Sequence, residues 1–400
     1  MSKKGNIILG DKVLWGALAL LSIFSFLPVF SASSNLAYVV GQGTPWGYLF
    51  KHFIVMMFGF GLMFAIHKIP YQYFKGISIL AMPLIVLLLI YTASQGNMIG
   101  GANANRWIKI PIVGLSFQTS SLAALVLLSY VAHYLSKTDI DLKNFKSAIL
   151  PLWVPIFVVV FLILPSNLST AVLIFFTTII LVFLGGYPLK YMLIMFGAGL
   201  FFGLVFILFA KAFPDMVPNR VDTWVNRIEN FSASDSNQGN YQIERAKIAI
   251  ATGGVVGLGA GKSVMKNFLP QSSSDFIYAI IVEEFGLIGG IGLIVLYLIL
   301  LFRIVVIAHK SQTVFGKLLV LGLGLPVIIQ AFANMGVALQ VFPVTGQTLP
   351  LISSGGTAAW MTCIAFGIIL SVSSEQKIEE NKEESQEFND NPLAVLSETL

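Results

Sequence analysis

Apolar runs of about 20 residues, separated by short polar segments, make up most of the chain. A run of roughly 20 apolar residues crosses the hydrocarbon core of a bilayer as a helix, and each such segment must satisfy its own backbone hydrogen bonds there. The pattern predicts an all-α polytopic membrane protein with about ten transmembrane helices. The predicted spans are residues 13–31, 49–67, 74–92, 119–135, 148–165, 169–186, 190–210, 276–306, 315–340 and 350–372. The first run is long for a signal peptide and further spans follow it, so we expect it to be retained.

The composition agrees with a membrane protein. Of 400 residues, 56% are hydrophobic and 11% are charged, whereas a soluble domain carries roughly a quarter of its residues as charge. These values exclude a water-soluble enzyme, a fibrous repeat and a disulfide-stapled secreted domain. The one cysteine, Cys363, cannot form an internal bridge, and the four histidines share no ligand spacing. The sequence therefore indicates no metal cluster and no cofactor, and leaves open a divalent cation such as Mg²⁺.

Charge divides the chain into two regions. Residues 375–400 carry eight acids and two lysines, a net charge of −6, while the first 374 residues carry 22 basic and 11 acidic groups, a net charge of +11. A polar segment with few aromatic residues cannot bury enough apolar surface to fold. We therefore expect a membrane domain at 1–374 and a disordered acidic cytoplasmic tail at 375–400.

Lysine and arginine set the expected orientation, because they concentrate in cytoplasmic loops. The loops after even-numbered spans carry most of them, and the short loops after odd-numbered spans carry almost none. Both termini are therefore expected in the cytoplasm. Two outside segments break the pattern, residues 93–118 and a large extracytoplasmic loop at about 211–275 between spans seven and eight. Long loops escape the positive-inside rule and are often functional.

Three acids on or beside the eighth span are candidates for chemistry at the outer face. Glu283 and Glu284 lie near the outer boundary, and Asp275 stands about 12 Å further out on a helix that rises ~1.5 Å per residue. Ionisable groups near hydrocarbon are costly and indicate function. An acid at the mouth of an outside-facing cavity suits a general base. The alternative is that Asp275 only caps the N-terminus of the eighth span.

The segment 257–263 reads GLGAGKS and looks like a nucleotide-binding P-loop. That motif needs a glycine where this chain has Val256, so the segment is not expected to bind nucleotide. Its glycines are expected to allow either close helix packing or a close approach of the backbone to a ligand. Lys262 and Lys266 beside them either neutralise phosphate as point charges or are solvated loop lysines.

Two further segments carry candidate binding groups. Arg106 and Trp107 form either an ordinary headgroup anchor or a guanidinium fork beside an aromatic platform. The uncharged, turn-forming stretch 342–356 either lines a cavity at membrane depth or is a plain connector.

These segments, in this order, resemble the SEDS family of bacterial cell-wall proteins, which includes FtsW, RodA and a sporulation homologue. The strongest match comprises GLGAGKSVMKNFLP at 257–270, DFIYA at 275–279 and EEFG at 283–286. The others are PVTG at 343–346 with LP at 349–350 and SSGG at 353–356, and RWI at 106–108 with FQ at 117–118. The resemblance covers the chain apart from its acidic tail.

The resemblance implies a peptidoglycan glycosyltransferase that polymerises lipid II at the outer face of the bacterial cytoplasmic membrane. The family's catalytic aspartate falls on Asp275, with Glu283 and Glu284 as supporting residues. The substrate-binding residues that follow from the resemblance and from the positive charge of the large loop are Arg106, Trp107, Lys262, Lys266, Arg227, Arg245, Gln118, Ser354 and Gly355.

The chain departs from the family pattern at several charged positions. The family's Pro-Glu becomes Pro270-Gln271, and its Ala-His-Thr becomes three serines at 272–274. Its QPSELAK run becomes QTSSLAA at 118–124, which loses a glutamate and a lysine. Its PDLGT run becomes SNLST at 166–170, which loses an aspartate.

Two other functions stay open on the residues alone, a lipid II flippase and a non-catalytic division scaffold. A transporter usually has internal repeats and charged groups along a path through the bilayer, whereas the acids here cluster at the outer face. The QxxxAKIAI run at 242–250 and the charged tail resemble the division branch of the family. The implied partners are lipid II and the undecaprenyl-linked glycan chain, a class B penicillin-binding transpeptidase and other division-complex membrane proteins, with no nucleic acid.

Overall fold

The computed structural model describes residues 9–38, 43–94, 98–99, 102–103, 107–109, 116–137, 145–213, 221–232, 238–269 and 272–390. Up to the seventh span the elements are α1 (Lys12–Tyr38), α2 (Pro45–Ile66), α3 (Tyr73–Ser94), β1 (Met98–Ile99), β2 (Ala102–Asn103), β3 (Trp107–Lys109), β4 (Ser116–Gln118), α4 (Thr119–Leu135), α5 (Phe145–Ala148), η1 (Ile149–Trp153), α6 (Val154–Ile163), α7 (Leu168–Leu184) and α8 (Leu189–Ala212). The remainder comprises α9 (Val221–Ser232), α10 (Gln238–Gly253), η2 (Met265–Asn267), α11 (Ile277–Lys310), α12 (Val314–Ala338) and α13 (Thr357–Asp390).

Apolar helices confirm the predicted architecture. In the described part of the chain, eight helical segments are long and apolar enough to cross a membrane, and α4 and α7 are shorter apolar helices. Each predicted span coincides with one of these segments. The fifth span is built from α5, η1 and α6, because a π-helical turn around Pro151 interrupts it. The tenth begins at Thr357 instead of 350, because the preceding residues are irregular.

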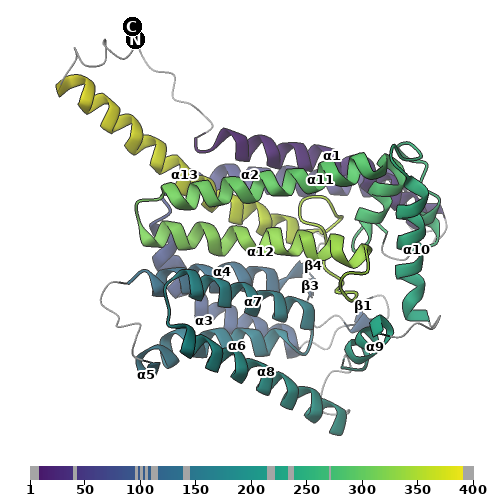
Figure 1. Ribbon diagram of the computed structural model, residues 1–400, viewed down its shortest axis with the longest axis horizontal. Helices are drawn as coiled ribbons and strands as arrows, with labels where there is room; N and C mark the ends of the chain where they lie inside the picture. Colours follow the sequence, from purple (N-terminus) through teal and green to yellow (C-terminus); the bar gives the residue numbers. More distant parts are fainter. Residues whose placement is uncertain are drawn as a thin grey trace.

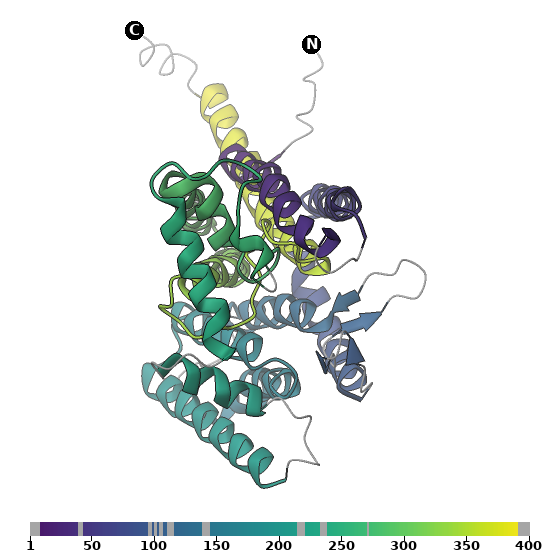
Figure 2. The same cartoon turned by 90° about the vertical axis from the view of Figure 1, so that its right-hand side faces the viewer.

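The spans run side by side as a bundle, with α12 in its interior (Figure 1). α12 packs against α4, α7, α11 and α13, and α2 packs against α13. By contrast, α8 lies at the periphery, and few of its residues are buried. The helices α9 and α10 and the antiparallel pairs β1–β2 and β3–β4 gather at one end of the bundle. Figure 2 looks onto this end, with the strands on one side and α10 on the other.

The opposite end of the bundle is fastened by polar contacts near the start of α1. Asp11 accepts a hydrogen bond from the Leu14 amide at 2.8 Å and forms an ion pair with Arg303 of α11. Lys377 of α13 donates to the carbonyl of Gly10 at 2.7 Å. Burial raises the pKa of the Asp11 carboxyl, but the hydrogen bonds from Arg303 and the Leu14 amide outweigh burial and hold it below its ordinary value. The start of α1 and the charged part of α13 therefore lie at the same end of the bundle.

The acidic tail differs from its predicted disorder over part of its length. α13 leaves the apolar region and continues as a helix to Asp390, while residues 391–400 lie outside the described part of the chain. The segment 375–390 is rich in glutamate, lysine and glutamine. These residues lose little side-chain freedom in a helix, and the apolar helix before them already supplies the costly nucleus.

Candidate active site

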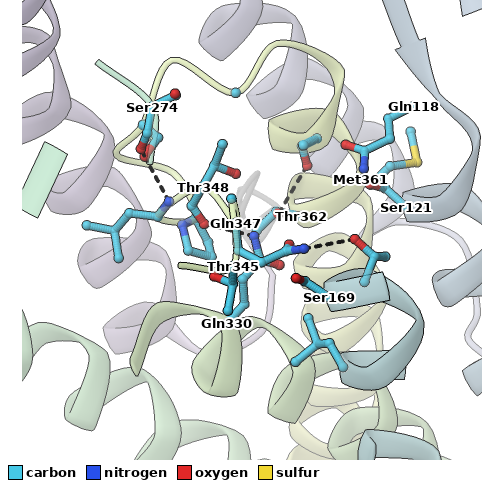
Figure 3. A pocket seen from close by; sticks show the side chains of 18 of the residues that line it. Gln118, Ser121, Ser169, Ser274, Gln330, Thr345, Gln347, Thr348, Met361 and Thr362 are labelled. Carbon is cyan, nitrogen blue, oxygen red and sulfur yellow. Dashed lines mark hydrogen bonds between the residues drawn. The ribbon is translucent and has the colours of Figure 1, made fainter. Parts of the chain in front are cut away.

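A cavity of about 1030 Å³ opens among α2, α4, α7, α9, α12, α13 and the irregular segment 342–356. Polar side chains from these elements point into one space, as the labelled residues of Figure 3 show. The segment is held in place by hydrogen bonds from Gln330 to the Thr348 carbonyl (2.8 Å) and from Gln347 to the Thr170 hydroxyl (2.9 Å). Of the two interpretations of 342–356, the structure therefore favours the cavity lining.

Asp275 lines this cavity. It lies in the turn 272–276, immediately before α11 begins at Ile277, so it is not itself a helical residue. A β-carbon built on Gly346 would lie 3.5 Å from Asp275 Oδ2 and 3.8 Å from Arg227 Nη1. Gly346 has a φ of +66°, a conformation that suits glycine. Because glycine has no side chain, position 346 leaves room for the Asp275 carboxylate and the Arg227 guanidinium in one small region of the cavity wall.

Arg227 reaches the cavity from α9, a short helix at the same end of the bundle as α10. The same helix places Trp224 in the cavity wall, with its ring 6.4 Å from that of Phe206 on α8. Burial lowers the pKa of Arg227, and the Asp275 carboxylate acts in the opposite direction. Because an arginine does not lose its proton in proteins, the guanidinium stays charged, and its burial strengthens its interaction with any anion that enters.

Several predicted site residues are brought together at this cavity. Gln118, Ser354 and Gly355 line it with Asp275 and Arg227.

Lys51 also lines the cavity and is not among the residues predicted from the sequence. It lies on α2, inside the second apolar run, and a lone lysine in such a run is the signal that indicates it. Lys51, Arg227 and Asp275 are the Lys, Arg, Asp or Glu residues among the described residues that line the cavity.

Other predicted residues lie elsewhere. Arg106 is outside the described residues, and only the backbone of Trp107 is described, paired with Gln118 in the β3–β4 hairpin. Arg245 lies over the rings of Tyr241 and Phe268.

Lys262 and Lys266 occupy the loop after α10. Lys262 is exposed, and the Lys266 ammonium donates to the Gly261 carbonyl (2.8 Å) and the Ser31 hydroxyl (3.1 Å). Neither lysine lines the cavity, and neither does Arg245.

Glu283 and Glu284 face away from the cavity and are 0% and 1% exposed. Glu283 accepts hydrogen bonds from the Ser263 hydroxyl and from the Val264 amide at 2.9 Å. Glu284 accepts from the Ser31 hydroxyl and from the Ser263 amide at 3.3 Å. The two carboxylates thus attach the loop after α10 to α11 and α1, which favours a structural role.

The glycines of the P-loop-like segment serve backbone packing. α11 is broken at Gly286, whose φ of 66° and ψ of −169° are not helical. Around this break the amides of Leu258 and Gly259 donate to the carbonyls of Glu283 (3.0 Å) and Glu284 (2.9 Å). A β-carbon on Gly257 would lie 2.3 Å from the Glu284 carbonyl oxygen. Of the two expected roles, the structure shows close packing, of the glycine-rich segment against α11.

Replacing Gly257 with alanine should destabilise the folded protein by about 1–3 kcal/mol. The added methyl group meets a backbone oxygen that cannot move aside, and the residue has a φ of +88°. The melting temperature of the purified protein in detergent measures the effect. Gly61→Ala is the matched control, because a β-carbon on Gly61 would meet nothing within 4 Å. Equal melting temperatures for the two variants would contradict the packing argument.

Three positions at which the chain lacks a charge of the family pattern lie in the cavity wall. Ser121, Ala124 and Asn167 line the cavity, where the pattern has a glutamate, a lysine and an aspartate. Asn167 instead caps α7, by accepting a hydrogen bond from the Thr170 amide at 3.3 Å. Gln271 lies outside the described residues. The described residues also contain no group of three or more His, Cys, Asp or Glu side chains that would hold a metal ion.

Comparison with known proteins gives consistent matches over the membrane domain. A family model described as "Cell cycle protein", which covers FtsW, RodA and SpoVE, matches residues 11–378. A relative from Nitrosococcus halophilus, named "Probable peptidoglycan glycosyltransferase FtsW", is 29% identical over 374 residues, covering 92% of this chain and 93% of that protein. A relative of the same name from Geobacter sulfurreducens is 32% identical over 361 residues, covering 89% and 93%.

Solved structures share the fold. A chain from the structure described as "Structural coordination of polymerization and crosslinking by a peptidoglycan synthase complex" matches with a TM-score of 0.69 and 25% identity, over 92% of this chain and 98% of that one. The rod shape determining protein RodA of Thermus thermophilus matches with a TM-score of 0.64 and 24% identity, over 92% and 97%.

Proposed function

This chain belongs to the FtsW, RodA and SpoVE family, and from that premise we propose that it polymerises lipid II into the glycan strands of peptidoglycan, with Asp275 as the general base. Its relatives are named peptidoglycan glycosyltransferases and cover nearly its whole length. The observation that carries the proposal is the location of Asp275 in the wall of a large cavity that many polar side chains line, close to the half-buried guanidinium of Arg227.

The proposed reaction is a single inverting displacement. The 4-hydroxyl oxygen of the acceptor sugar forms a bond to C1 of the donor sugar, and the bond from C1 to the donor diphosphate breaks. Asp275 accepts the proton of the hydroxyl group, as a general base. The diphosphate leaves with the electron pair of the broken bond, so it needs positive charge around it more than it needs a proton from an acid.

Arg227 and Lys51 are the cations that we assign to the diphosphate groups. Arg227 offers a planar, multiply donating group that matches phosphate oxygens, and Lys51 offers a point charge on the α2 wall. Fixed positive charges in a site screened from water stabilise charge that develops on a leaving group. Gln118, Ser354 and Gly355 line the same cavity and are proposed to contact the substrate through neutral hydrogen bonds.

The protein is an integral membrane protein, and we propose that its active site opens at the extracytoplasmic face. Two features support this side. The loops rich in lysine and arginine predict that both termini are cytoplasmic. The turn that carries Asp275 precedes α11 at its α10 end, whereas Asp11 and Arg303 meet at the other end of the bundle.

The proposed partners are a class B penicillin-binding transpeptidase, lipid II and the growing undecaprenyl-linked glycan chain. A structural neighbour belongs to a peptidoglycan synthase complex that couples polymerisation to crosslinking, and the relatives carry the name FtsW. We therefore place the activity in septal synthesis, together with other membrane proteins of the division complex.

Purified protein supplied with lipid II and the partner transpeptidase should form glycan polymers visible on a gel. A lipid II flippase would instead move labelled lipid II across vesicle membranes without forming polymer. A scaffold would do neither. Polymer formation by the wild type, in amounts that scale with protein concentration, is the expected result, and its absence at every protein concentration tested would refute the proposed function.

A further inference from the structure

Three consecutive main-chain carbonyl groups precede α11, those of Ser273, Ser274 and Asp275, and each accepts a hydrogen bond from outside the turn. The Ser354 amide donates to Ser273 at 2.9 Å, and the Ser353 hydroxyl donates to Ser274 at 2.6 Å. The third donor is the side-chain amide of Asn334 on α12, which reaches the Asp275 carbonyl at 2.8 Å. The backbone that carries the proposed base is thus held at three successive points.

Asn334 also holds the opposite side of the cavity wall. The same amide nitrogen donates to the Gln347 carbonyl at 2.7 Å, so one side chain joins the turn at 275 to the segment 342–356. The side chain is 1% exposed, and its Oδ1 atom has no hydrogen-bond partner among the described residues. A buried amide with an unpaired oxygen is costly. The contribution of Asn334 to the structure is therefore its two donated hydrogen bonds. Both of them fix the backbone around Asp275.

Ser353 makes a comparable connection. Its hydroxyl group donates to the Ser274 carbonyl and accepts a hydrogen bond from the Leu349 amide at 2.8 Å. The side chain is 3% exposed. The hydroxyl group thus uses its donor and one acceptor position for hydrogen bonds within the protein. These bonds support the turn, and the donor is not available to a ligand.

We propose that Asn334 and Ser353 are positioning residues for the transferase reaction, which act by fixing the main chain of residues 273–275 so that the Asp275 carboxylate faces the acceptor hydroxyl. The proposal rests on the proposed function, in which Asp275 is the base. Asp275 lies in a turn and not in a helix, so the regular hydrogen bonds of α11 do not fix its backbone. The donors from α12 and from 353–354 provide that constraint.

The expected size of the effect follows from the sensitivity of proton transfer to geometry. A general base must lie within hydrogen-bonding distance of the proton that it removes, and a displacement of about 1 Å costs on the order of 100-fold in rate. When one of the three hydrogen bonds to the turn is lost, the other two remain. The turn should therefore shift by less than it would if all three were lost. Each variant should therefore lower kcat by about 10- to 100-fold and leave the KM for lipid II within about twofold of the wild type.

The test compares Asn334→Asp and Ser353→Ala with the wild type in steady-state polymerisation. Asn334→Asp keeps the size of the side chain and replaces the donor with an oxygen that faces two carbonyl oxygens. Ser353→Thr keeps the hydroxyl group and should restore most of the rate lost in Ser353→Ala. Thr178→Ala is the control for a lost buried hydroxyl, because Thr178 is 0% exposed and donates only within its own helix, to Ile174 at 2.7 Å.

The outcomes distinguish two hypotheses, that Asp275 is the general base and that Asn334 and Ser353 position it. Asp275→Asn is measured in parallel, and activity in that variant would overturn the base assignment itself. An inactive Asp275→Asn together with wild-type kcat in Asn334→Asp and Ser353→Ala would overturn only the positioning role. Equal losses in Ser353→Ala and Ser353→Thr would assign the effect to packing and remove the role of the hydroxyl group. If Asn334→Asp does not fold, the Ser353 pair still decides.

Discussion

Replacing Asp275 with asparagine is expected to lower the rate of glycan polymerisation by about 10³-fold. The amide is nearly isosteric with the carboxylate but accepts no proton from the acceptor hydroxyl. The carbonyl of residue 275 still accepts its hydrogen bond from Asn334, so the turn should keep its shape. Polymer yield from lipid II at fixed protein concentration measures the loss, and the melting temperature in detergent checks that the fold is intact.

Glu244→Gln is the matched control for this experiment. Glu244 is an exposed acid on α10, in the same long segment between α8 and α11, and it does not line the cavity. The Glu244→Gln variant should retain wild-type polymerisation activity. Near-normal glycan synthesis by Asp275→Asn would mean that another group accepts the proton, and the assignment of the base would be wrong.

Replacing Arg227 with glutamine should lower kcat/KM by about 10²- to 10³-fold, the range seen when one fixed donor to developing charge is removed. The guanidinium is partly buried beside Asp275, so its charge acts in a medium that screens it less than water does. Arg227→Lys should recover part of the activity, because it restores the charge without the planar arrangement of donors. Initial rates over a range of lipid II concentrations separate the effect on binding from the effect on turnover.

Lys247→Gln serves as the comparison for loss of a positive charge. Lys247 is exposed on α10 and lies outside the cavity wall, so its variant should behave like the wild type at moderate salt. If both substitutions lowered the rate equally, the effect would reflect the general positive charge of the loop, and the local role of Arg227 would be refuted.

The membrane architecture was predictable because each span carries its own signal. An apolar run of sufficient length must form a helix in the bilayer whatever its neighbours do, and the predicted spans coincide with the helices observed. Asp275 was also recognisable, since an acid just outside the apolar part of the eighth span stands out against the hydrocarbon region.

The orientation of Glu283 and Glu284 was not predictable from helical spacing. Such spacing assumes one continuous helix from residue 275, whereas α11 begins at Ile277 and breaks at Gly286. The glycine-rich loop folds back against this break and supplies the hydrogen bonds that bury both carboxylates. That contact joins segments about 20 residues apart through backbone groups, which leave no trace in a pattern of apolar and polar side chains.

That Lys51 and Arg227 line the same cavity is a result of tertiary packing. The two residues come from α2 and α9, far apart in the chain. They share the cavity because α2 packs against α13, while α9 lies at the end of the bundle that also holds α10. A single lysine in an apolar run indicates a functional position but cannot identify what it faces.

α13 links the two faces of the membrane in one continuous element. Its first turns contribute Met361 and Thr362 to the cavity wall (Figure 3), and the same helix continues to Asp390. At ~1.5 Å per residue, about 40 Å of helix separates Thr362 from that end. A helix is stiff along its axis, so we expect a force applied to the charged end of α13 to tilt or shift the turns of the same helix that line the cavity.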